Sequence, residues 1–145
     1  MTISPVGLNL IRQCEGFRSK PYRCPGGDAT IGFGHVLRPG ETFESISRRD
    51  AEQLLLKDIA LVTLALRRLI VVPLHQHQWD SLISFTFNIG SGAFQRSRLR
   101  QCVNRSHHAY VPAELMRWTR AGSKILPGLL QRRRLEARLY QGLWG

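Results

Sequence analysis

The sequence is poor in acidic residues. Only 10 of its 145 residues are Asp or Glu, against 21 Lys or Arg, and the formal net charge is +11. A surplus of that size favours polyanionic partners, which include nucleic acid, an anionic membrane surface and an anionic cell-wall polymer. The charge alone does not choose among them, and a surface that only keeps the chain soluble would have the same composition.

Cysteine is also scarce. The chain has three, Cys14, Cys24 and Cys102, an odd number without the spacing of a metal site. This excludes the framework of a disulfide-stapled secreted domain and favours a reduced cytosolic origin. The sequence leaves open whether Cys14 and Cys24 form a disulfide after exposure to an oxidising compartment.

Long hydrophobic runs are missing. The longest apolar patch, residues 59–72, is interrupted by Thr63 and by Arg67 and Arg68, whereas a membrane-spanning helix needs about 20 apolar residues. The first seven residues lack the basic start and apolar core of a signal peptide. We therefore expect no transmembrane segment, and a protein that needs help to leave the cytoplasm.

The first element that the sequence predicts is a helix. Ser4 and Pro5 have the form of an N-cap followed by proline at the first helical position. Apolar residues then recur at helical spacing, which predicts a helix over residues 5–15 that stops at Gly16. Glu15 lies in its last turn, where the partial negative charge of a helix C-terminus opposes ionisation of a carboxylate.

Residues 17–40 have the character of β-structure and turns. The segment Cys24-Pro-Gly-Gly27 predicts a tight turn. In the strand that follows, Thr30, Gly32 and Gly34 are expected on one face and residues 31, 33 and 35 on the other. Because mid-strand glycines often mark the close approach of a ligand, that first face is expected to form the bare wall of a cleft.

The remainder is predicted to be helical. A long helix follows the cap at Ser47 and runs to about residue 71, before Pro73. Beyond Pro73 every element is expected to be a helix, with a break at residues 88–92. The expected helices cover about residues 75–88, 97–104, 114–118 and 127–141.

One spacing is highly specific. Glu15, Cys24 and Thr30 follow the pattern Glu-x8-Cys-x5-Thr, and Ile-Gly-Phe-Gly-His35 comes directly afterwards. This resembles the signature of the phage-type lysozymes, the T4-like endolysin family, in which the second position is Asp or Cys. The resemblance continues over essentially the whole chain, through Asp50-Ala-Glu, Phe85-x-Phe-Asn-Ile-Gly-x-Gly, Trp118 and the closing Leu-Pro-Gly-Leu with its arginines.

The resemblance implies an α+β, mainly α fold: one lysozyme domain over residues 1–145. A small β-hairpin lobe (15–47) and a helical lobe (1–14 and 72–145) would be joined by the helix 48–71. The implied reaction is hydrolysis of the β-1,4 bond between N-acetylmuramic acid and N-acetylglucosamine in peptidoglycan, with inversion at the anomeric carbon. Glu15 would be the general acid, and Cys24 and Thr30 would hold the attacking water.

Cys24 departs from the commoner aspartate. A free thiol has a pKa of roughly 8.5 and is mostly neutral at pH 7. It could orient the water weakly, which we favour. It could instead ionise with the help of arginines such as Arg23, or Asp28 could supply the carboxylate.

The resemblance also implies sugar-binding roles in the cleft. These are assigned to Gly32, Gly34, Phe87, Asn88 and Trp118, although core packing is an equally ordinary role for the aromatic residues.

The resemblance further implies that His35 forms a structural ion pair with Asp58. No second ligand stands near His35 in the sequence, so we expect no metal, and we expect no cofactor. Arg132-Arg133-Arg134 is most often a solvated face, but it could also attract anionic envelope polymers or place one arginine near Glu15. The sequence leaves these alternatives open.

Two rival functions remain. A lytic transglycosylase needs one catalytic carboxylate and no activated water, which suits the missing aspartate. A basic nucleic-acid-binding helical protein would explain the charge but not residues 15–35, and no specific nucleic-acid motif is present. The expected partner is therefore the peptidoglycan glycan strand, bound by a monomer that is made in the host cytoplasm and acts on the wall in the periplasm after release.

Overall fold

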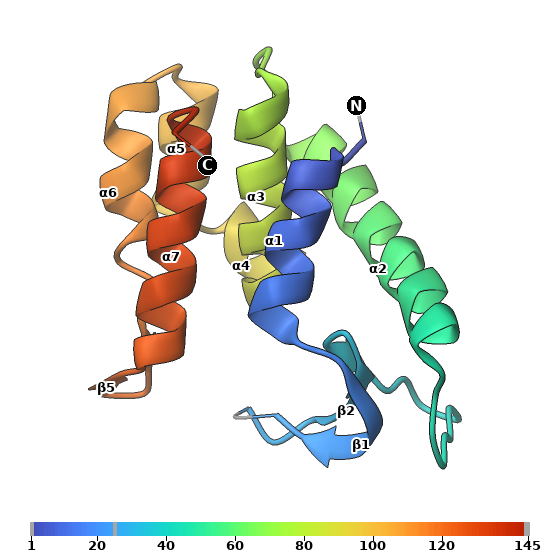
Figure 1. Ribbon diagram of the computed structural model, residues 1–145. Helices are drawn as coiled ribbons and strands as arrows, with labels where there is room; N and C mark the ends of the chain where they lie inside the picture. Colours follow the sequence, from blue (N-terminus) through green and yellow to red (C-terminus); the bar gives the residue numbers. More distant parts are fainter. Residues whose placement is uncertain (1, 25, 144–145) are drawn as a thin grey trace.

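The computed structural model describes residues 2–24 and 26–143, a mainly helical chain with small antiparallel sheets (Figure 1). This confirms the predicted fold class. Helices α1, α3 and α7 stand side by side, and a three-stranded sheet lies below α1. No helix in the described ranges is both long and apolar enough to cross a bilayer.

Helix α1 (Pro5–Glu15) forms as its caps predict. The Ser4 hydroxyl accepts a hydrogen bond from the Gly7 N–H, and Gly16 ends the helix with a left-handed φ of 68°. The Ser4 side chain also bonds Asp80 of the neighbouring helix α3, which ties the start of α1 to the helical part of the molecule.

Strands β1 (Arg18–Arg23), β2 (Ala29–Gly32) and β3 (His35–Val36) form the antiparallel sheet in the order β1-β2-β3. Tyr22 pairs with Thr30, and Ile31 pairs with His35. The single strand expected through His35 is therefore wrong. The chain turns at residues 33–34, so Gly34 lies in a hairpin turn between two strands and not on the face of one.

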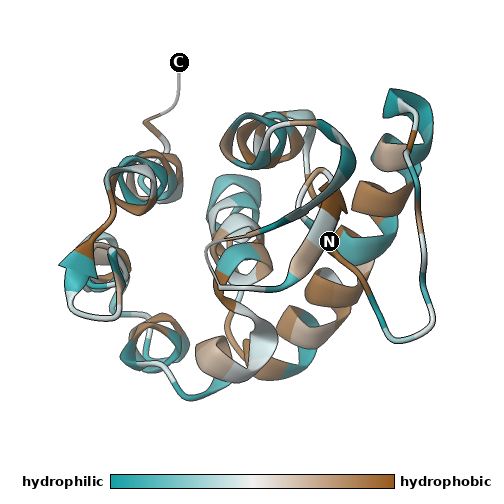
Figure 2. Cartoon of the chain, turned by 90° about the horizontal axis from the view of Figure 1, so that it is seen from below, coloured by the Kyte–Doolittle hydropathy of each residue, from teal (hydrophilic) through white to brown (hydrophobic). Residues whose placement is uncertain are grey.

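Helix α2 (Arg48–Leu69) connects the sheet to the helices behind it (Figure 1). The Ser47 hydroxyl caps it by accepting a hydrogen bond from the Asp50 N–H at 3.1 Å. One side of the helix is apolar and buried, and it packs against β2 and α3. Figure 2 shows both hydrophobic and hydrophilic residues around the helices, as expected of amphipathic helices that cover a core.

The second half of the chain contains α3 (Gln76–Ile89), α4 (Ser91–Gln95), α5 (Arg98–Asn104), the 3-10 turn η1 (His108–Tyr110), α6 (Val111–Leu115) and α7 (Pro127–Tyr140). The expectation that every element beyond Pro73 is helical is wrong. Strands β4 (Arg120–Ala121) and β5 (Lys124–Ile125) form a short hairpin around Gly122, which has a φ of 64°. Helix α4 also begins inside the predicted break at residues 88–92.

The core lies among α1, α2, α3 and the C-terminal helices. Its buried apolar side chains come from every one of these elements, so the helices share one interior. Members with no exposed surface include Ile11, Leu66, Leu82, Ile83, Phe85, Phe94, Leu99, Val103, Val111 and Leu115.

Candidate active site

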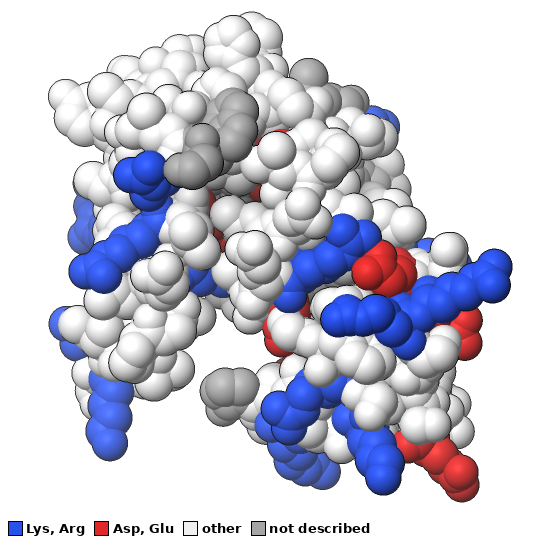
Figure 3. Space-filling view, in the orientation of Figure 1, with Lys and Arg blue, Asp and Glu red and all other residues white. Residues whose placement is uncertain are grey.

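A cavity of about 1000 Å³ separates the sheet from the helices. Its walls come from the end of α1, the hairpin strands, the end of α3 and the segment from β4 into α7. In the space-filling view the molecule is hollowed at this place, and Lys and Arg side chains lie at both edges of the hollow (Figure 3). The cavity is thus open to a long substrate and flanked by positive charge.

Glu15 enters this cavity from the last residue of α1. Its side chain is only 16% exposed, and one carboxylate oxygen, Oε2, accepts a hydrogen bond from Nη1 of Arg132 on α7. Arg132 is itself 5% exposed, so the contact is a nearly buried ion pair. It fixes the direction in which the Glu15 carboxyl group points.

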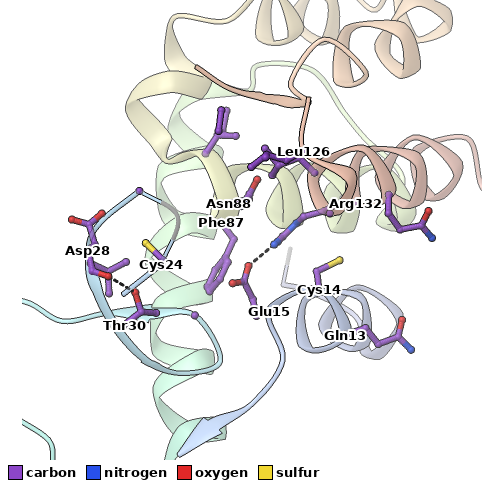
Figure 4. Close-up of a pocket in the computed structure, with 18 of the residues that line it drawn as sticks. Gln13, Cys14, Glu15, Cys24, Asp28, Thr30, Phe87, Asn88, Leu126 and Arg132 are labelled. Atoms are coloured by element: carbon purple, nitrogen blue, oxygen red, sulfur yellow. Dashed lines mark hydrogen bonds and ion pairs between the residues drawn. The ribbon is translucent and has the colours of Figure 1, made fainter. Parts of the chain in front are cut away.

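Cys24 and Thr30 lie across the cavity from Glu15 and Arg132 (Figure 4). The turn that holds them is hydrogen-bonded: the Gly27 N–H donates to the Cys24 carbonyl at 2.8 Å, and the Cys24 N–H donates to the Asp28 carbonyl at 3.0 Å. The Thr30 hydroxyl donates to that same carbonyl at 3.1 Å. Pro25, which the turn prediction included, lies outside the described residues.

The Cys24 thiol has a distinctive environment. Partial burial acts to raise its pKa, but the neighbouring Thr30 side chain and the backbone of Gly26 and Asp28 outweigh that effect, so the pKa lies below its ordinary value. Arg23 does not supply this shift, because its guanidinium donates to the Gly27 carbonyl at 2.7 Å. All three cysteines are free thiols in the structure.

Asp28 also lines the cavity. Its side chain is exposed, and its carboxylate points to the outer side of the turn, away from Glu15 (Figure 4). Of the candidates for holding a water opposite Glu15, Cys24 and Thr30 are therefore better placed in this structure than the Asp28 carboxylate.

The two glycines assigned to the cleft wall have different surroundings. Gly34 lines the cavity with a φ of 70°, and a Cβ there would lie 2.3 Å from Oε1 of Glu15. Gly32 is not among the described residues that line the cavity, and its Cβ would meet Ala51 of α2 at 3.2 Å. This glycine allows the strand to approach α2, and its expected role in the cleft wall stays a prediction.

The end of α3 brings Phe87 and Asn88 to the cavity. The Asn88 side-chain oxygen accepts a hydrogen bond from Arg133 at 2.5 Å, so its amide is held in one orientation. Trp118 does not lie among the described lining residues. It packs edge-on against Phe85 with ring centroids 5.5 Å apart, and its expected sugar contact stays a prediction.

The three successive arginines of α7 do not form a solvated face. Arg132 and Arg133 are 5% and 0% exposed, and only Arg134 is at the surface. The sequence left open whether one of these arginines lies near Glu15, and Arg132 does. The cause is Glu136, one turn further on, which is fully buried and pairs with both inward-facing arginines.

His35, the first residue of β3, is not among the described residues that line the cavity, and it is 3% exposed. Its Nδ1 lies 2.7 Å from Oδ2 of Asp58 on α2, the residue with which it was expected to pair. Its Nε2 lies 3.0 Å from Oε1 of Glu41. These contacts join the β3 hairpin to α2.

Sequence reasoning did not single out Glu136, Ser84 or Tyr22. The spacing of Arg132 and Glu136, four residues apart on a helix, is a signal for their pairing, but burial of the pair has no such local signal. Within the described ranges, no group of three or more His, Cys, Asp or Glu side chains is arranged to hold a metal ion.

Comparisons with known proteins agree with this geometry. The phage lysozyme family model matches residues 12–136. The endolysin of Acyrthosiphon pisum secondary endosymbiont phage 1 is 42% identical, over 97% of this chain and 99% of that protein. The endolysin of Bacillus phage PZA is 34% identical over 97% of this chain, which spans about half (55%) of that longer protein.

A solved structure gives the same result. The muramidase domain of SpmX from Asticaccaulis excentricus superposes with a TM-score of 0.86 at 32% identity, covering 96% of this chain and 97% of that one. Fold, cavity and relatives together define a glycoside hydrolase of the lysozyme class. The chain belongs to the phage lysozyme family.

Proposed function

We propose that this protein hydrolyses the β-1,4 bond between N-acetylmuramic acid and N-acetylglucosamine in peptidoglycan, with inversion at the anomeric carbon. Glu15 is the general acid that protonates the leaving oxygen. Cys24 and Thr30 hold the water that attacks from the other side of the sugar ring.

One observation carries this proposal: Glu15 and the Cys24–Thr30 pair face each other across a single open cavity (Figure 4). An inverting glycosidase needs its acid and its water-activating group on opposite faces of the sugar, with room for the water between them. A substrate bound between the two walls meets this requirement.

Cys24 acts mainly by orienting the water. An oxocarbenium-like centre is a strong electrophile, so the attacking water needs little activation by a base. The polar groups of the turn that lower the Cys24 pKa also increase the fraction of thiolate that can accept the proton of the water.

Phe87 and Asn88 bind the sugars beside the scissile bond. An aromatic ring offers an apolar surface to a pyranose face. The Asn88 amide presents its N–H₂ group to sugar hydroxyls, because its oxygen is occupied by Arg133. Gly34 leaves the space around Glu15 open.

In the cell, the protein is made in the host cytoplasm and reaches peptidoglycan in the periplasm after release through another factor. It acts as a monomer, without cofactor or metal. Its exposed basic residues also attract anionic polymers of the envelope through long-range electrostatics.

The variant Glu15→Gln tests the assignment of the acid. We expect its clearing of a peptidoglycan suspension to fall at least about 100-fold, because general acid catalysis contributes on that order. Glu44→Gln is the matched control: the same change at an exposed carboxylate outside the cavity lining should leave clearing unaffected. Full activity of Glu15→Gln would refute the proposal.

Product analysis tests the rest. NMR of the first product should show inverted anomeric configuration, and mass spectrometry should show reducing ends. Retention would instead indicate a covalent or substrate-assisted route. Anhydro-muramic ends, one water lighter, would identify a lytic transglycosylase, the alternative suggested by the thiol at position 24.

A further inference from the structure

A continuous chain of buried polar contacts runs from Glu15 to Asn88 through helix α7. Arg132 bonds Glu15 with Nη1, and its Nε lies 3.2 Å from Oε2 of Glu136. The Glu136 carboxylate in turn lies 3.0 Å from Nε of Arg133, whose Nη2 donates to Asn88 at 2.5 Å. The catalytic acid and a sugar-binding amide are therefore held by one set of side chains.

The surroundings fix this set in place. The Ser84 hydroxyl donates to Oε2 of Glu136 at 2.6 Å, and its carbonyl accepts from Nη2 of Arg132 at 3.0 Å. The guanidinium of Arg133 lies over the Phe85 ring, 4.7 Å from its centroid. Because Arg133 and Glu136 have no exposed surface, water cannot screen their charges as it would at the surface.

The charges of the set balance. Two guanidinium groups, Arg132 and Arg133, face two carboxyl groups, Glu15 and Glu136. Burial raises the pKa of Glu136 above its ordinary value, although the contacts with Arg133 and Arg132 act to lower it. Of the two carboxyl groups, only Glu15 lines the cavity. The buried Glu136 therefore offsets positive charge of Arg132 and Arg133 that would otherwise favour the ionised form of Glu15.

The other titratable groups near Glu15 add little charge around neutral pH. Burial raises the pKa of Cys14, and partial burial together with Glu15 itself raises the pKa of Tyr22. Both side chains are therefore neutral there. The charged or titratable groups that face Glu15 are Arg132, Arg133 and Glu136 from α7, Cys14 from α1 and Tyr22 from β1.

We propose that Glu136 and Arg133 are positioning residues, which set how strongly Arg132 holds Glu15 as a carboxylate and hence the pH range in which Glu15 can donate its proton. This rests on the proposed role of Glu15 as general acid. A cation beside Glu15 favours its ionised form, which cannot act as an acid. Glu136 weakens that effect, and Arg133 strengthens it.

Two variants should therefore shift the alkaline limb of the pH–activity profile in opposite directions. In Glu136→Gln two cations face Glu15 alone, so activity should be lost at a pH lower by about one unit or more. In Arg133→Met a cation is removed, so activity should persist to a higher pH. The double variant restores the balance of charge, and its limb should return toward that of the unaltered protein.

Clearing of a peptidoglycan suspension would be measured over pH for all three variants, with folding checked by circular dichroism. Glu114→Gln is the matched control, since Glu114 pairs only with Arg117 among the ion pairs of the described residues, and its limb should not move. If Glu136→Gln does not fold, Arg133→Met and the double variant still decide the question.

Purely structural damage would lower the activity of every variant without moving the limb. Limbs that do not move, or that shift in the same direction in Glu136→Gln and Arg133→Met, would overturn the proposal. In that case Glu15→Gln would still be inactive. An active Glu15→Gln variant would instead refute the assignment of the acid itself, so the two failures are distinguishable.

Discussion

At the residue scale, Gly34 is the position where the backbone and Glu15, the proposed general acid, constrain each other most directly. Its φ of 70° disfavours a side chain, and any Cβ would overlap the Glu15 carboxylate. Glycine is thus needed here for two independent reasons, one conformational and one functional.

The variant Gly34→Ala separates these two reasons. We expect a loss of stability of about 1–2 kcal/mol from the left-handed backbone, and a larger effect on activity, roughly 100-fold, because the acid must move. Gly40→Ala is the control: its φ is 87°, but nothing lies within 4 Å of the added Cβ. Equal loss of activity in the two variants, measured on folded protein, would contradict this explanation.

Cys24 is the second position that determines the chemistry at this scale. Because its pKa is lowered and that of Cys14 is raised, Cys24 carries more thiolate at any pH below both values, about tenfold more for each unit of difference. Iodoacetamide at pH 7 should therefore alkylate Cys24 well before Cys14, as peptide mass mapping would show.

The alkylated protein should lose lytic activity, since the adduct fills the space for the attacking water. Cys14→Ser should be inactivated at the same rate as the unaltered protein. Faster modification of Cys14 would show that the polar groups of the Thr30 turn do not activate the thiol as described.

At the scale of elements, local signals predicted most of the helices, whereas the candidate site residues Glu15, Cys24 and Thr30 came from the resemblance of their spacing to a family signature and stay a prediction. Caps such as Ser4 and Ser47, and stops such as Gly16, act through adjacent backbone groups and can be read from neighbouring residues. The β4–β5 hairpin could not be predicted in this way, because each strand has only two residues and no alternating pattern.

Helix α7 shows why burial is harder to predict than helix formation. Arginine is usually exposed, so Arg132 and Arg133 resemble a solvated face in the sequence. They are buried because Glu136 and Glu15 supply counter-charges, and Glu15 lies at the other end of the chain. The role of Trp118 is hard to predict for a similar reason, since an aromatic residue can serve a core or a cleft equally well.

At the scale of the whole molecule, the positive charge is unevenly distributed. Residues 90–145 contain 11 basic and 2 acidic residues, whereas residues 1–89 contain 10 basic and 8 acidic ones. Of the two acidic residues in the later part, Glu136 is buried and Glu114 is 15% exposed beside Arg117. The exposed surface of the C-terminal helices is therefore strongly cationic.

We expect the rate of lysis to fall as ionic strength rises from about 0.01 M to about 0.15 M, over which the Debye length shortens from about 30 Å to about 8 Å. The double variant Arg134→Gln/Arg138→Gln, on the exposed side of α7, should clear peptidoglycan roughly twofold or more slowly at the lower ionic strength and depend less on salt.

Lys57→Gln/Arg68→Gln on α2 removes the same charge from the less cationic part of the chain and serves as the comparison. Salt dependences that are equal in the two double variants would show that net charge matters and its location does not.

The ion pair between Glu15 and Arg132 joins residues 117 positions apart in the sequence. Contacts of such long separation must overcome the entropy of closing the whole intervening chain, so they form late and slow the folding reaction. Helices can be complete in a chain whose catalytic acid still lacks its arginine. The contact between Glu15 and Arg132 therefore requires both ends of the chain to come together, and a molecule that lacks this closure has the two side chains without their ion pair.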